Sequence, residues 1–193
     1  SEGEVMYTFL LVLTTLIWGS TFFIIKDTVA SVNPFFIVFG RTLIAAISML
    51  IFIAVKHPSG LKDLTSIKYG TILGFLMAII YASQTIGLKY TSSGHSAFVT
   101  GIAVVLVPIF LYIFFRQRLK IFLILPVIIV FTGLFLLTYD LETRFNKGDL
   151  ITLITAVALA FHTIGAGIFV RKSNVYTLVA FQFAAAALFS VLV

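Results

Sequence analysis

Charge is scarce in this chain of 193 residues: 10% of them are Asp, Glu, Lys or Arg, whereas 61% are hydrophobic. Soluble globular domains carry about 25% charged residues, so the composition excludes an ordinary soluble domain. Cysteine is absent, which excludes disulfide bonds and thiolate metal sites. We therefore expect an integral membrane protein whose main partner is the lipid bilayer.

Acidic residues are also few, and none lies near the middle of an apolar segment. The seven are Glu2, Glu4, Asp27, Asp63, Asp140, Glu142 and Asp149. Proton coupling through a mid-membrane carboxylate is disfavoured for this reason. The sequence also lacks metal-ligand spacing, a nucleophile–base set and a phosphate-binding glycine loop. We expect no enzyme activity, no metal and no cofactor. The basic residues are scattered over short connectors and form no nucleic-acid patch.

Continuous apolar segments make up most of the chain. Each is close to the roughly 20 residues that an α-helix needs to cross a bilayer. The seven segments are residues 5–25, 34–55, 69–88, 96–115, 122–139, 150–170 and 176–193. The fold class expected is therefore all-α, a polytopic membrane helix bundle with about seven transmembrane helices.

Basic residues in the connectors predict the orientation of the chain, because Lys and Arg concentrate on the cytoplasmic side. If the N-terminus is cytoplasmic, the inner connectors hold eight basic residues and the outer ones four. The inner set is Lys56, Lys62, Lys68, Arg116, Arg118, Lys120, Arg171 and Lys172, and the outer set is Lys26, Lys89, Arg144 and Lys147. A cytoplasmic N-terminus is therefore favoured.

An internal repeat pairs residues 33–48 with residues 174–189, which places Asn174 on Asn33 and Gln182 on Arg41. The copies are five helices apart, an odd number, so the second must be upside down relative to the first. Inverted repeats of this kind are common in secondary transporters, where the site lies near the midplane at the repeat interface. The repeat favours transport.

Arg41 is the residue least suited to lipid, since it lies inside the apolar segment 34–55. An arginine within a span costs a few kcal/mol or more, so it needs water, a partner or a function. It either lies near a transport pathway or reaches an interface or the end carbonyls of a neighbouring helix.

Other polar or aromatic side chains lie within apolar segments and could line a wet cavity. Tyr81 and Gln84 share a helix face and suit a zwitterionic or aromatic solute, although interhelical hydrogen bonding explains them equally well. Trp18 shares a face with threonines and either lines a cavity or packs. His162 is a candidate for solute contact or protonation, or is a satisfied hydrogen-bonding residue. Thr100 precedes Pro108, which predicts a kink.

Two glycines, Gly70 and Gly74, have the spacing that lets two membrane helices approach closely. We interpret them as packing residues.

Several short motifs together resemble the EamA-type branch of the drug/metabolite transporter (DMT) superfamily. They are Trp18-Gly19-Ser20 with Phe22 and Lys26, Asn33-Pro34 leading to Arg41, Leu88-Lys89-Tyr90-Thr91-Ser92, Gly94, Ala97, Phe98 and Pro108, and Gly148-Asp149-Leu150. Two positions depart from the family pattern. Arg116-Gln117-Arg118 stands where an acidic residue is usual, and Phe161-His162 stands where a tryptophan-alanine pair is usual.

The resemblance implies a ten-helix protein of two inverted five-helix repeats (5+5) in the cytoplasmic membrane. Residues 1–140 would form the first repeat, and residues 147–193 would begin the second, with some 100 residues and three helices absent. The seventh segment ends at Val193 without a polar residue, as expected of an interrupted helix.

The function expected is a secondary transporter or exporter of small organic metabolites, amino-acid-like or drug-like, that works by alternating access. Solute would contact the residues Trp18, Arg41, Tyr81, Gln84, Thr100 and His162. The alternative is a non-transporting membrane scaffold or assembly subunit. No feature of the sequence indicates an oligomer.

Overall fold

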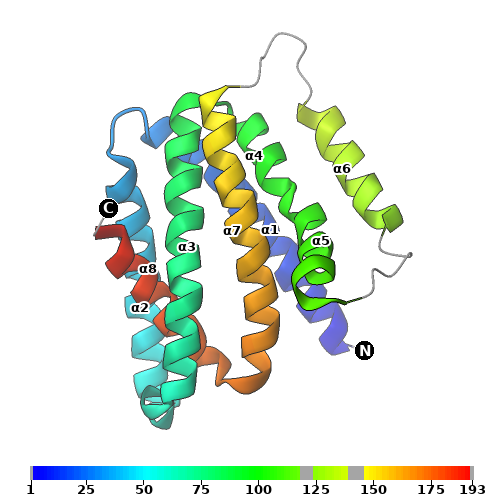
Figure 1. Cartoon of the computed structure of the whole chain (residues 1–193). Helices are drawn as coiled ribbons and strands as arrows, with labels where there is room; N and C mark the ends of the chain where they lie inside the picture. Colours follow the sequence, from blue (N-terminus) through cyan, green and yellow to red (C-terminus); the bar gives the residue numbers. More distant parts are fainter. Residues whose placement is uncertain (1, 118–123, 139–145, 192–193) are drawn as a thin grey trace.

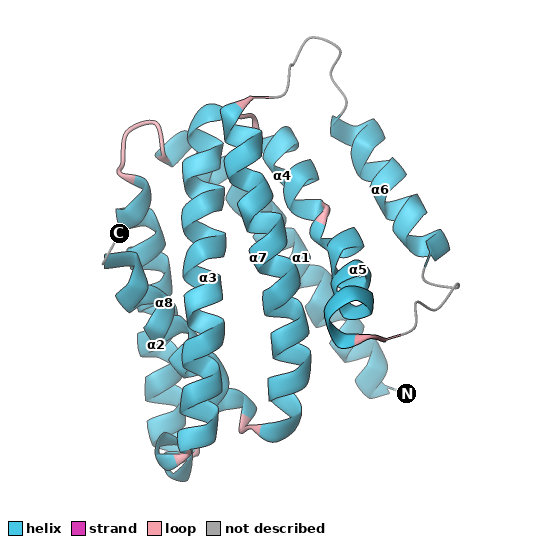
Figure 2. Ribbon diagram, in the orientation of Figure 1, coloured by secondary structure: helices cyan, strands magenta, loops and turns pink. Residues whose placement is uncertain are grey.

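The computed structural model describes residues 2–117, 124–138 and 146–191, and within these ranges every element is a helix (Figure 2). Five helices are long and apolar enough to cross a membrane, namely Glu4–Thr28, Pro34–Lys56, Leu64–Tyr90, Ser93–Phe115 and Lys147–Lys172. The predicted all-α membrane protein is confirmed.

The helices follow one another up and down the bundle (Figure 1). They are α1 (Glu2–Thr28), α2 (Pro34–Lys56), η1 (Pro58–Lys62), α3 (Leu64–Tyr90), α4 (Ser93–Gly101), α5 (Ala103–Phe115), α6 (Ile124–Thr138), α7 (Lys147–Phe169), η3 (Val170–Lys172) and α8 (Val175–Val191). Helices α6 and α8 are shorter than a full span. The expected segments 122–139 and 176–193 include residues 122, 123, 139, 192 and 193, which lie outside the described ranges. A total of seven spans therefore stays a prediction.

Helix α3 is the centre of the bundle, packed along its length against α7 and α8 (Figure 1). In its most apolar stretch 56% of the residues are buried, against 11% in α1. Gly70 and Gly74 face α8 so closely that a Cβ atom on Gly74 would lie 2.5 Å from the carbonyl oxygen of Gln182. The predicted packing role of these glycines is confirmed.

Polar caps set the starts of the helices. Asn33 caps α2, with its side-chain oxygen 2.9 Å from the Phe35 amide, and Pro34 occupies the first turn. Asp63 caps α3 by accepting hydrogen bonds from the amides of Thr65 and Ser66. Helix α3 therefore begins at Leu64, earlier than the apolar segment that starts at residue 69, because a cap can hold a polar first turn.

The fourth expected segment consists of two helices, α4 and α5, that meet at Ile102. The Ile102 amide donates to the carbonyl of Val99 at 3.2 Å, a tightened 3₁₀-type turn. The irregularity lies beside Gly101, a poor helix former, and upstream of Pro108.

The packing of α3 on α8 predicts that alanine destabilises the protein at one glycine and is tolerated at another. Gly74→Ala forces the backbones apart and should destabilise the protein by about 1–3 kcal/mol, as overpacking typically does. Gly167→Ala is the matched control, since its Cβ would meet nothing within 4 Å. Thermal unfolding in detergent should show a lower midpoint for Gly74→Ala alone. Equal midpoints for the two variants would contradict the close approach.

Candidate functional site

Arg41 lies against Tyr81, with the guanidinium carbon 4.1 Å from the centre of the tyrosine ring. The two residues come from α2 and α3, so the structure brings together two of the predicted site residues. The Nη1 nitrogen of Arg41 is buried and has no hydrogen-bond partner within the described part of the chain. The guanidinium thus lies against an aromatic ring while one of its donor nitrogens has no acceptor.

Ser173 Oγ, in the turn between η3 and α8, is buried without a hydrogen-bond partner in the described part of the chain. Within the helices, four side chains besides Arg41 carry such buried polar atoms. They are Gln84 at Nε2, Thr85 and Thr100 at Oγ1, and Ser96 at Oγ. Their exposed fractions are 4% or less. Helical threonines normally bond a carbonyl of the preceding turn, as Thr71 does. A buried polar atom without a partner costs about 1–3 kcal/mol and indicates a site for water or ligand.

We call Arg41, Gln84, Thr85, Ser96 and Thr100 the central polar cluster. At 1.5 Å per residue, Arg41 lies about 10 Å from the start of α2, Gln84 about 9 Å from the end of α3, and Thr100 about 10 Å from the start of α4. These three helix ends lie on one side of the bundle (Figure 1). Arg41, Gln84 and Thr100 are therefore at about the same level, well inside the apolar region, whereas Ser96 lies about 5 Å from the start of α4.

A second polar contact joins α7, α8 and α3. His162 Nε2 lies 3.3 Å from Gln182 Oε1, and Gln182 Nε2 lies 3.6 Å from the sulfur of Met77. Met77 is one helical turn from Tyr81 on the same face of α3. Arg41 and Gln182, which the repeat pairs, therefore contact neighbouring positions of one helix face.

The structure does not bring Trp18 to the other predicted residues. It lies on α1 with 37% of its surface exposed. Its role in binding solute stays a prediction.

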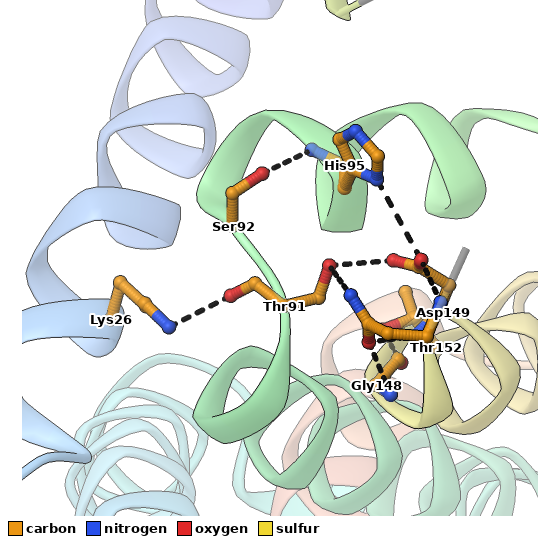
Figure 3. A network of polar contacts seen from close by, with 8 residues as sticks. Lys26, Thr91, Ser92, His95, Gly148, Asp149 and Thr152 are labelled. Atoms are coloured by element: carbon orange, nitrogen blue, oxygen red, sulfur yellow. Dashed lines mark hydrogen bonds and ion pairs between the residues drawn. The ribbon is translucent and has the colours of Figure 1, made fainter. Parts of the chain in front are cut away.

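Sequence reasoning assigned no function to a polar network at the ends of three helices (Figure 3). The carboxylate of Asp149, in the first turn of α7, is fully buried. It accepts hydrogen bonds from the Thr91 hydroxyl at 2.6 Å and from the Asn146 amide at 2.9 Å. Its Oδ2 also lies 3.6 Å from Nδ1 of His95 on α4.

Lys26 attaches the end of α1 to this network. Its ammonium donates to the carbonyl of Thr91 at 2.8 Å (Figure 3) and to that of Leu88, also at 2.8 Å. A cation at the C-terminus of α3 also interacts favourably with the helix dipole. The local signal for the network is the capping box from Asn146 to Asp149. Its long-range partners are not visible in the sequence.

Cavities occur away from the central polar cluster. One of about 450 Å³ lies between α5 and α7, with Thr163, Gly167, Gln117, Arg171 and Lys172 among its lining residues. Three others are lined almost wholly by apolar side chains of α2, α3, α7 and α8. No residue of the cluster lines any of these four.

The model of the EamA-like transporter family matches residues 5–139. Three proteins of Archaeoglobus fulgidus, each described as an uncharacterized transporter, are also similar. The first is 32% identical over 76% of this chain and 44% of its own length. The second is 27% identical over 87% and 60%, and the third 25% identical over 93% and 64%. The chain thus spans about half of these relatives. No solved structure matches.

The Thr91 hydroxyl should be essential to the stability of the network. Thr91→Val keeps the shape but removes a donor to the buried carboxylate, so we expect a loss of about 1–3 kcal/mol. Thr71→Val is the control, because the exposed Thr71 hydroxyl bonds only its own helix. Thermal unfolding in detergent should separate the two variants. A Thr91→Val midpoint no lower than that of Thr71→Val would show that the network contributes little.

Proposed function

The chain belongs to the EamA-like transporter family and is an integral membrane protein, and from this premise we propose that it forms part of a secondary transporter of small organic solutes. Amino-acid-like or drug-like metabolites are the solutes that the side chains suit. The proposal keeps the N-terminus in the cytoplasm, on the basis of the basic connectors.

The observation that carries the proposal is the central polar cluster. A bundle packed in lipid has no reason to bury a guanidinium edge, an amide and three hydroxyls without partners unless something else satisfies them. In our proposal solute contacts Arg41, Gln84 and Thr100, and Tyr81 holds the guanidinium in place. His162 would contact solute deeper in the bundle, beside Gln182.

Unequal packing supports alternating access as the mechanism. Helix α3 is hydrogen-bonded to a neighbour at each end. At its start the Ser66 hydroxyl accepts from the Asn174 backbone amide, just before α8, at 2.8 Å, and at its end the Thr91 hydroxyl donates to Asp149 of α7. Helix α1 is mostly exposed. We propose that α1 and α5 move against a rigid unit of α2, α3, α7 and α8, with the turn at Ile102 as a hinge.

The repeat extends the proposal to a ten-helix, 5+5 architecture, with residues 1–140 as the first repeat and 147–193 within the second. Helices α2 and α8 run antiparallel and pack together (Figure 1). Asn33 and Asn174 each accept a hydrogen bond from an amide in the first turn of the helix that follows. Both features are those that an inverted repeat requires.

Uptake into proteoliposomes tests the transport proposal. The whole protein that contains this chain is reconstituted and offered a defined mixture of amino acids, organic acids and amines, and the trapped solutes are measured by mass spectrometry. We expect uptake above empty liposomes, and at least a ten-fold loss in Gln84→Met, which removes the amide and keeps the volume. Thr71→Val should transport normally.

Two results would argue against the proposal. Unchanged uptake by Gln84→Met would remove the central polar cluster from the solute site. Wild-type uptake equal to that of empty liposomes would favour a membrane scaffold or assembly subunit.

A further inference from the structure

We propose that the solute carries an anionic group, a carboxylate or a phosphate, and that this group binds the guanidinium of Arg41. The inference rests on the proposed solute site and names the chemistry that the site selects.

The geometry of Arg41 leaves its hydrogen-bonding edge for a ligand. The guanidinium carbon lies over the Tyr81 ring, 4.1 Å from its centre. The N–H groups of the guanidinium point outward in its plane, where they match the two oxygens of a carboxylate or phosphate. Nη1 is buried and without an acceptor, so an acceptor must come from outside the described chain.

No described carboxylate neutralises Arg41. Glu4, Asp27 and Asp63 lie at helix ends, and Asp149 is already bound by Thr91 and Asn146. A cation inside the bundle without a counter-ion is costly, because the lipid and the packed helices cannot solvate it. An anionic solute would supply the missing charge on binding.

The rest of the central polar cluster offers donors as well. The unpartnered atom of Gln84 is the amide nitrogen, which can only donate. The hydroxyls of Thr85, Ser96 and Thr100 can each donate one hydrogen bond. The same hydroxyl oxygens can also accept hydrogen bonds, but the cluster provides no carboxylate to neutralise an ammonium group, and the Arg41 charge would repel it. The set therefore favours anions over amines.

The cavity between α5 and α7 is positively charged, like Arg41. Arg171 and Lys172 line it, and no acidic residue is among its lining residues. A cationic cavity of this kind concentrates anions near the bundle. This observation is independent of Arg41.

Equilibrium dialysis of the purified chain in detergent tests the inference directly. The chain is dialysed at pH 7 against an equimolar mixture, and the bound compounds are measured by mass spectrometry. The probes are benzoate, hexanoate, succinate and inorganic phosphate, together with benzamide, hexanamide, succinamide, benzylamine and hexylamine. We expect at least one of the anions to bind at least ten times more than any amide or amine.

Variants assign the selectivity to Arg41. Arg41→Gln should reduce anion binding by about 10- to 100-fold, the usual effect of losing a charge-assisted hydrogen bond. Arg41→Lys should retain part of the anion binding, because lysine keeps the positive charge but lacks the paired N–H groups of the guanidinium. Lys68→Gln removes the same charge from an exposed site and should bind anions normally. Circular dichroism and thermal unfolding show whether each variant folds.

The outcomes separate this inference from the proposed function. Amides or amines bound as tightly as anions, or anion binding unchanged in Arg41→Gln, would overturn the anionic class and leave the transport proposal to the uptake assay. The absence of any anion binding to the wild-type chain would overturn it too, because a guanidinium with an open edge should capture simple anions. Uptake of neutral solutes that depends on Gln84 would then still support transport.

Discussion

The close approach of α3 to α7 and α8 is the constraint on which the rest of the structure depends. Lipid tails are as apolar as leucine, so membrane helices associate through dispersion contacts and hydrogen bonds and gain little from apolar burial. Gly70 and Gly74 let the α3 backbone meet that of α8, near the hydrogen bond of Ser66 with Asn174. Gly87 and Gly148 bring α3 and α7 equally close at the other end, beside the hydrogen bond of Thr91 with Asp149. A wider separation would lose both.

Two ionisable residues inside this assembly show opposite arrangements. Asp149 is fully buried, yet the Thr91 hydroxyl and the Asn146 backbone amide donate hydrogen bonds to its carboxylate oxygens, as expected of a structural residue. Arg41 has only an aromatic face beneath it and an unpartnered donor edge. Buried polar atoms without hydrogen-bond partners lower the stability of a packed bundle and add no contact that holds it together. The difference is the physical reason to connect Arg41 with function and Asp149 with architecture.

Hydropathy was enough to predict the five long spans, because a helix in lipid must satisfy its own backbone and therefore appears as a continuous apolar run. Periodicity also predicted that Tyr81 and Gln84 share a face, and the spacing of Gly70 and Gly74 predicted a close contact. What sequence could not predict is pairing across helices. The partner of Arg41 depends on how α2 rotates against α3, and the hydrogen bond from Thr91 to Asp149 joins residues far apart in the chain.

Helix α1 illustrates how attachment at one end shapes possible motion. Its C-terminal turns pack Phe22 and Ile25 on Leu88, and the Lys26 ammonium donates to carbonyls at the C-terminal end of α3. Its earlier turns, including Trp18, are exposed within the described structure. A rigid rod fixed at one end pivots there, so the largest displacement falls at the N-terminal end of the helix. In a movement of α1 about this attachment, Trp18 would therefore be displaced further than Phe22.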